Sequence, residues 1–104
     1  MLNWIGENLD GDIQLERIAA AGNVCPRVCQ RLFQKYLRCR PGEYVQRARI
    51  LRAAEAIAAT DDPITEIATA NGFSSPSYFT KQFRRYLGSA PREYRQAQRA
   101  ELSA

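Results

Sequence analysis

Residues 63–95 read PITEIATANGFSSPSYFTKQFRRYLGSAPREYR, and this stretch decides the fold. Gly72 and Gly88 tolerate positive φ, so they predict the ends of two successive helices. Ser75 followed by Pro76 places a capping side chain before a proline, which is typical of a helix start. The pattern therefore predicts a short helix, a tight turn and a second helix, which is the outline of a helix-turn-helix.

The second of these helices has two chemically different faces. Its apolar residues recur at helical spacing and are Phe79, Phe83, Tyr86 and Leu87. The opposite face is polar and basic, with Ser77, Thr80, Lys81 and Arg84. Asp62-Pro63 predicts the start of the preceding helix by the same cap-then-proline device.

An earlier copy of the whole pattern precedes this stretch. At an offset of 50 the matching pairs are Pro26/Pro76, Phe33/Phe83, Tyr36/Tyr86, Leu37/Leu87, Pro41/Pro91, Glu43/Glu93, Tyr44/Tyr94 and Gln46/Gln96. Further upstream the offset is 49, with Leu15/Ile64, Ile18/Ile67, Ala19/Ala68 and Ala21/Ala70. The chain therefore contains an internal duplication whose second copy has a turn one residue longer.

The predicted fold is all-α. We expect helices over residues 2–9, 13–21, 26–37, 41–59, 63–70 and 76–87, and from Pro91 toward Arg99, with a frayed tail. In the helix from Pro26 we expect Cys29, Phe33, Tyr36 and Leu37 to face inward. The expected organisation is a first helix-turn-helix unit over residues 1–40, a linker helix over 41–59 and a second unit over 60–104, together one compact domain.

Charge is distributed unevenly along the 104 residues. The net charge is +4, yet residues 17–42 hold six basic residues and no acid, and residues 67–92 hold four basic residues and no acid. Both windows coincide with a predicted turn and second helix. Because an ordinary solvated face mixes both signs, this segregation favours a polyanionic partner.

These residues resemble the DNA-binding domain of the AraC/XylS family of bacterial transcription regulators. The resemblance covers roughly residues 4–95 and is strongest over 64–95, with the pattern I-x-x-I-A-x-x-x-G-F-x-x-x-S-Y-F-x-x-x-F-(K/R)-x-x-x-G-x-x-P-x-x-(Y/F)-R. It implies about seven helices, two homeodomain-like helix-turn-helix units joined by a long linker helix, and the second helix of each unit in the DNA major groove. It also implies a transcription activator that contacts RNA polymerase, although the residues themselves do not distinguish activation from repression.

Three residues of the first copy depart from the family pattern. Cys25 stands where the family has a capping serine, Cys29 where it has a bulky apolar residue, and Arg38 where it has a glycine stop. The chain has no room for the effector-binding domain that most members carry. We therefore expect a short stand-alone regulator, or a DNA-binding domain excised from a longer effector-responsive one.

Reading DNA requires side chains that project into the major groove from the early turns of each second helix. The candidates are Arg27, Gln30 and Arg31 in the first unit, and Ser77, Tyr78 and Lys81 in the second. Arginine suits a guanine edge and glutamine an adenine edge, whereas Tyr78 can instead pack at the edge of its unit. The candidates for phosphate contacts are Gln34, Lys35, Thr80 and Arg84.

Other chemistry finds little support in the sequence. The chain has no histidine and no Cys-x-x-Cys pair, so we expect no metal and no cofactor. We interpret Cys29 as a small buried apolar residue, and we expect no redox or metal role for Cys25 or Cys39. No nucleophile–base pair, phosphate loop or carboxylate cluster indicates an enzyme. Neither a signal peptide nor a membrane helix is predicted, so the expected location is the cytoplasm.

One chain carries two different second helices, so we expect a monomer to bind double-stranded DNA over two adjacent major-groove segments. The predicted linker helix of 19 residues would be about 28 Å long, close to one turn of DNA. The alternative that stays open is a protein-interaction module, which binds RNA polymerase or another regulator and has weak or lost DNA contact.

Overall fold

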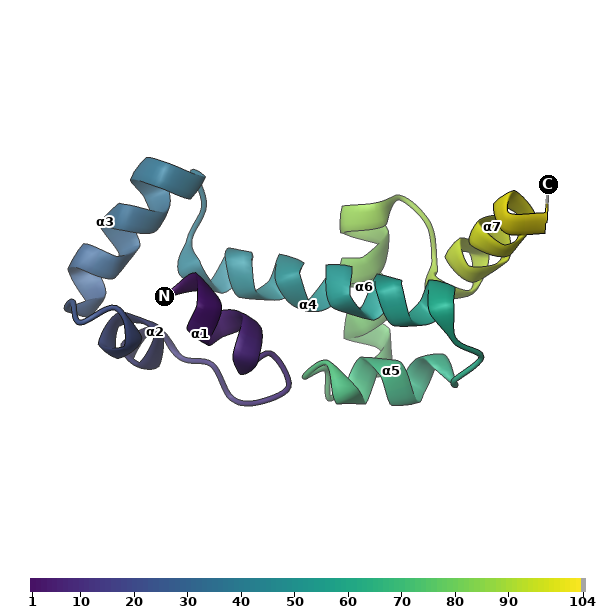
Figure 1. Cartoon of the computed structure of the whole chain (residues 1–104), viewed down its shortest axis with the longest axis horizontal. Coiled ribbons are helices and arrows are strands. Elements are labelled where there is room, and N and C mark those ends of the chain that lie inside the picture. The colour runs from purple at the N-terminus through teal and green to yellow at the C-terminus, as the bar shows by residue number, and fades with distance from the viewer. Residues whose placement is uncertain (104) are drawn as a thin grey trace. The chain divides into compact units, whose positions relative to one another are not determined.

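The computed structural model describes residues 1–103, with side chains through Glu101, and this part of the chain folds into helices joined by short turns. The helices are α1 (Leu2–Glu7), α2 (Leu15–Ala21), α3 (Pro26–Leu37), α4 (Pro41–Ala59), α5 (Ile64–Ala70), α6 (Pro76–Leu87) and α7 (Pro91–Ser103) (Figure 1). The all-α prediction, with two helix-turn-helix units and a long helix between them, is confirmed. Two compact units divide the chain within α4: the first unit ends at Ala48 and the second begins at Arg49.

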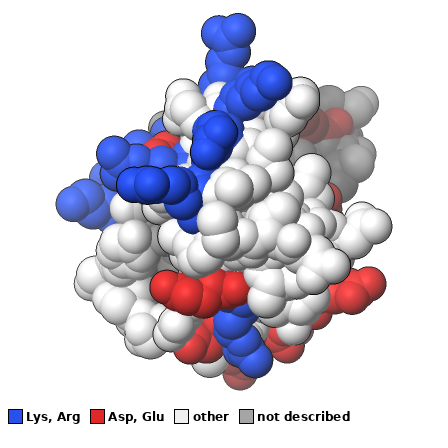
Figure 2. Space-filling view, turned by 90° about the vertical axis from the view of Figure 1, so that its left-hand side faces the viewer, with Lys and Arg blue, Asp and Glu red and all other residues white. Residues whose placement is uncertain are grey.

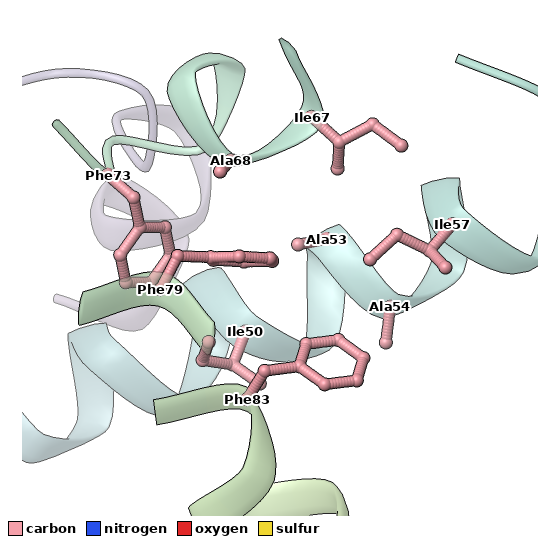
Figure 3. Close-up of a cluster of buried hydrophobic side chains, with 9 residues drawn as sticks. All are labelled: Ile50, Ala53, Ala54, Ile57, Ile67, Ala68, Phe73, Phe79 and Phe83. Atoms are coloured by element: carbon pink, nitrogen blue, oxygen red, sulfur yellow. The ribbon is translucent and has the colours of Figure 1, made fainter. Parts of the chain in front are cut away.

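The second unit has a core rich in aromatic rings. Figure 3 shows its buried side chains, which are Ile50, Ala53, Ala54 and Ile57 of α4, Ile67 and Ala68 of α5, Phe73 of the turn, and Phe79 and Phe83 of α6. The Phe79 ring lies 5.0 Å from the ring of Phe73, edge to face, and 5.6 Å from that of Phe83. Such contacts add to the burial of apolar area, and the Phe73–Phe79 contact fixes how α6 sits against the turn that follows α5.

Two arginines of α7 hold the end of α4 in the second unit. Arg95 donates from Nε to the Ile57 carbonyl at 2.9 Å and from Nη2 to the Asp62 carbonyl at 2.7 Å. Arg99 donates to the Thr60 carbonyl at 3.2 Å and pairs with the Asp61 carboxylate. The Ile57 carbonyl lies in the last turn of α4, where carbonyls have no partner inside the helix, and the Thr60 and Asp62 carbonyls belong to the segment between α4 and α5.

The first unit has a smaller core, and the N-terminal residue completes it. The buried residues there include Ile5, Ile18, Cys29 and Phe33. The Cys29 thiol lies 3.7 Å from the sulfur of Met1, and a Cβ added at Gly22 would stand 2.4 Å from Cγ of Met1. Glycine at position 22 therefore leaves the space that the methionine side chain fills.

The sequence duplication recurs as a duplication of contacts. The amide of Val24 donates to the Ala19 carbonyl at 3.0 Å, and the amide of Phe73 donates to that of Ala68 at 2.9 Å, so both turns close in the same way. The Phe33 and Tyr44 rings meet edge to face at 5.7 Å, and the equivalent Phe83 and Tyr94 rings meet at 5.4 Å. Each ring pair lies within one unit, so the two units are built on one plan.

Several sequence-based details need correction. α1 ends at Glu7, α2 begins at Leu15 and α7 continues to Ser103. Pro63 occupies the N-cap position of α5 and no side chain caps this helix, so the predicted role of Asp62 as a cap is wrong; its carbonyl serves Arg95 instead.

Two predicted core residues of α3 are not buried. Tyr36 is 70% exposed and Leu37 is 39% exposed, whereas Cys29 and Phe33 are buried as predicted. The helical period correctly identifies the face of α3 on which Tyr36 lies, but the last turn of α3 has too little of the first unit against it to cover these side chains.

Candidate nucleic-acid interface

The two helices expected to read DNA occupy equivalent positions in the two units. α3 and α6 each begin with proline at the first helical position and run for 12 residues. Each buries a stripe that includes Phe33 or Phe83, and the remaining circumference faces outward. Neither helix contains an acidic residue, so both outward faces are available to an anion.

All five residues predicted to contact DNA from the first unit lie on α3 and are exposed: Arg27, Gln30, Arg31, Gln34 and Lys35. Figure 2 views the side of the chain on which α3 lies in Figure 1. Basic side chains gather in the upper part of that face, most acidic ones lie in its lower part, and an uncharged surface separates them. No acidic residue lies between residues 17 and 42, so the exposed cations of α3 have no acidic neighbour along the helix, and charges of one sign attract a polyanion more strongly than mixed charges do.

The five predicted residues of the second unit lie on α6, and they differ in accessibility. Ser77, Lys81 and Arg84 are exposed, while Thr80 is half-buried. Tyr78 is 49% exposed and its ring lies 6.4 Å from that of Phe73, so it packs partly at the edge of the unit.

An acidic neighbour accompanies Arg84. Its guanidinium lies 3.7 Å from the Glu93 carboxylate of α7, and both side chains are 63% exposed. An exposed pair of this kind contributes little to stability, so a phosphate can take the place of the carboxylate with small loss.

Sequence reasoning missed Arg40. A concave surface at the junction of α3 and α4 is lined by Gln30, Arg31, Gln34, Arg40 and Pro41. Three of these were predicted to contact DNA, so Arg40 extends the same surface beyond the helix. Its side chain is 85% exposed and only 4.0 Å from the Glu43 carboxylate, a weak pairing. The acid-free window over residues 17–42 was the signal that could have identified it.

The two reading helices are anchored unequally at their ends. The Ser75 hydroxyl accepts a hydrogen bond from the Tyr78 amide at 3.2 Å and caps α6, whereas Cys25 makes no such bond at the start of α3. At the other ends, Gly88 has φ of 82° and Arg38 has φ of 54°. Left-handed backbone is unstrained in glycine but costly in arginine, so α3 is the less firmly ended helix.

The three cysteines occupy different environments. Cys25 is exposed, Cys39 is partly exposed and Cys29 is buried, and none forms a disulfide. Burial raises the pKa of the Cys29 thiol above its ordinary value, while the positive N-terminus acts in the opposite direction. The thiol therefore stays neutral and unreactive, as a small apolar core residue would.

The described residues contain neither a group of metal ligands nor a membrane-spanning helix. No group of three or more cysteine, aspartate or glutamate side chains is placed to hold a metal ion within that part of the chain. Among the helices described above, none is both long and apolar enough to cross a membrane.

The helix-turn-helix domain family matches residues 18–97, most of the chain. Among curated proteins, the chain is similar to the HTH-type transcriptional regulator GbdR of Pseudomonas aeruginosa, with 42% identity over 91 residues. That match covers 88% of this chain and 25% of GbdR, so the chain spans about a quarter of the length of this relative.

Two solved structures share both the fold and appreciable sequence identity. One is a transcriptional regulator of Chromobacterium violaceum described as AraC-type DNA-binding domain-containing, with a TM-score of 0.90, 30% identity and coverage of 93% of this chain and 87% of that one. The other is the DNA-binding domain of the global transcriptional factor AdpA in complex with a target DNA. Its TM-score is 0.88 and its identity 32%, with coverage of 96% and 90%.

Proposed function

The chain belongs to the AraC/XylS family of helix-turn-helix transcription regulators, and from this premise we propose that it binds double-stranded DNA through α3 and α6 and regulates transcription. The observation that carries the proposal is that both helices present exposed, polar, acid-free faces in equivalent positions of two duplicated units. The complex of the AdpA domain with its target DNA supports a DNA-binding role for this fold. A protein-interaction module without DNA contact would have no need for two such faces.

We propose distinct roles along α3. Arg27, Gln30 and Arg31 lie in its first half and reach base edges, where arginine suits guanine and glutamine suits adenine. Gln34 and Lys35 lie nearer its end and contact phosphates, which position the helix without reading sequence. Arg40 adds a phosphate contact next to Gln34, because both line the same concave surface.

In α6, Ser77, Tyr78 and Lys81 are the proposed base contacts, and Thr80 and Arg84 the proposed phosphate contacts. The side chains of α6 donate fewer bidentate hydrogen bonds than the arginines of α3, so we expect the half-site of the first unit to be more strongly specified and richer in guanine. Glu93 would release Arg84 when a phosphate approaches, since their contact is long and exposed.

We further propose that one chain binds one site as a monomer. The two units have different reading residues, so the site would be asymmetric, about 20 base pairs long and without a palindrome. The proposal also includes contact with RNA polymerase, transcriptional activation and a place in the bacterial cytoplasm, which family membership supports.

Selection of bound sequences from a pool of random duplexes tests the proposal. We expect one asymmetric consensus, with a 1:1 complex on the minimal duplex in analytical ultracentrifugation. Arg31→Ala should change the base preference in one half of the consensus only. Arg52→Ala removes an exposed arginine of α4 outside both reading faces and is the matched control. Absence of any enriched sequence would contradict the reading role, and a palindromic consensus with two chains per duplex would contradict the monomer.

A further inference from the structure

An apolar groove lies on the first unit, between the start of α1 and the apolar side of α3. Its volume is about 270 Å³, and its lining residues are Met1, Leu2, Leu32, Phe33, Tyr36 and Leu37. Three of these are unusually accessible for their size, because Leu2 is 44%, Tyr36 70% and Leu37 39% exposed. Adjacent exposed apolar side chains that also form a concave surface are typical of a binding site.

In the second unit, the side chains equivalent to those of the groove are better covered. At the offset of 50, Tyr86 and Leu87 match Tyr36 and Leu37, and both pack against the core of the second unit. Position 82, which matches Leu32, holds a glutamine. The first unit thus combines an additional apolar residue with less cover, so the exposure is a local departure from the duplicated plan.

The shape of the missing cover follows from the same comparison. In the second unit, Tyr86 and Leu87 pack against a core whose residues lie on α4, α5 and α6, apart from Phe73 of the turn. A groove between two helices that exposes leucine and tyrosine side chains suits the apolar stripe of a further helix. An extended strand would need a sheet edge, and no strand is present in the described residues.

Positive charge borders the groove. The Lys35 ammonium lies 5.3 Å from the centroid of the Tyr36 ring, so a cation contacts a lining residue directly. Arg38 follows Leu37 in the chain and is exposed. No acidic residue occurs between residues 17 and 42, and the acidic residue of α1, Glu7, lies at the end of that helix farther from Leu2. A helix entering the groove would therefore gain from acidic residues beside its apolar stripe.

We propose that this groove binds an amphipathic helix of a partner protein, with leucine-like residues on one face and acidic residues flanking them. Its apolar face would cover Leu32, Tyr36 and Leu37, and its carboxylates would pair with Lys35 and Arg38. The inference rests on the groove and its border, and does not require that the chain bind DNA.

The probe is a synthetic helical peptide of about 18 residues, with leucines spaced to form one stripe and glutamates at most other positions. A second peptide with lysine in place of every glutamate is the charge control. Binding is followed by fluorescence anisotropy of the labelled peptide and by amide chemical shifts of the protein. We expect the acidic peptide to shift resonances of Leu32, Tyr36 and Leu37, and the lysine peptide to bind at least about tenfold more weakly.

Substitutions of exposed side chains should leave the protein folded, so that a loss of peptide binding reports on the groove itself. Tyr36→Ser should weaken the acidic peptide about tenfold or more, while Leu51→Gln should have no effect, because Leu51 is a comparably exposed leucine of α4 outside the groove. Lys35→Glu should shift the preference toward the lysine peptide. Unchanged Trp4 fluorescence would verify that each variant is folded.

Three results would overturn the inference. They are absence of binding by the acidic peptide, equal affinity for both peptides, and affinity that Tyr36→Ser does not change. Shifts confined to Arg27 and Arg31, together with displacement by duplex DNA, would also overturn it, because the peptide would then be acting as a polyanion on the polar face of α3.

Discussion

The first unit should become more stable when the ends of α3 are given the residues that end α6. The change is the double substitution Cys25→Ser and Arg38→Gly. Serine at position 25 can accept a bond from an amide of the first turn, as Ser75 does from Tyr78 at 3.2 Å. A capping side chain contributes about 1 kcal/mol to the free energy of unfolding.

Glycine at position 38 removes strain at the other end of α3. Arg38 has φ of 54°, where a residue with a Cβ loses about 1–2 kcal/mol. Glycine offsets part of this gain, since its unfolded chain has more conformational freedom, and about 0.5 kcal/mol remains. The two sites lie at opposite ends of a 12-residue helix, about 18 Å apart. The effects should therefore add to about 1.5 kcal/mol, or a rise of roughly 6–12 °C in the midpoint of thermal unfolding.

The assay uses the single tryptophan of the chain. Trp4 packs against the core of the first unit, so its fluorescence reports the unfolding of that unit. The matched control places the reverse changes, Ser75→Cys and Gly88→Arg, in the second unit, where the midpoint followed by circular dichroism should fall. A Trp4 midpoint that stays constant or decreases in the Cys25→Ser, Arg38→Gly protein would refute the reasoning.

Three further predictions concern DNA. If about six of the ten basic residues in the windows 17–42 and 67–92 neutralise phosphates, affinity should fall about a thousandfold between 50 and 200 mM salt; a flat titration of anisotropy against salt would count against this. Arg31→Ala should cost roughly 1–3 kcal/mol on the preferred sequence and relax one half-site, whereas Lys35→Ala should weaken all duplexes equally; unchanged selection profiles for Arg31→Ala would remove its assignment. Cys39→Ser should bind DNA like the parent in reducing and oxidising buffers, and a redox response lost in this variant would instead identify a sensor.

The elements of this fold could be predicted from local signals. Pro26, Pro41, Pro76 and Pro91 each occupy the first helical position, so four helix starts were located to the residue. Asp62-Pro63 has the same pattern, but the helix start that it predicts is wrong, because Pro63 occupies the N-cap position and α5 begins one residue later. A cap-then-proline pattern fixes a start only when the backbone of the proline is itself helical.

Packing was predicted less completely, because a helical period identifies a face but not what covers it. Tyr36 lies on the buried side of α3 by spacing and is nevertheless 70% exposed. The contact of Met1 with Gly22 joins residues that no local pattern connects. For the candidate site, all the predicted residues lie on α3 or α6, yet the pairing of Arg84 with Glu93 depends on the packing of α7 and could not be foreseen.

The strained residue at the end of α3 connects stability with binding in the first unit. Arg38 and Gly88 both have a left-handed backbone conformation, but only arginine adds a positive charge. Arg38 lies within the acid-free window of residues 17–42, directly after the α3 residues that form the polar face and the apolar groove. The strained backbone of Arg38 lowers the stability of the first unit, but its guanidinium stands where we expect an anionic ligand to bind. A role in binding would therefore explain why this strain is tolerated. On this argument Arg38→Gly alone should raise the unfolding midpoint and lower the affinity for DNA, while Cys25→Ser should raise the midpoint and leave the affinity unchanged. If Arg38→Gly stabilised the first unit without weakening DNA binding, the strain at Arg38 would have no role in DNA binding.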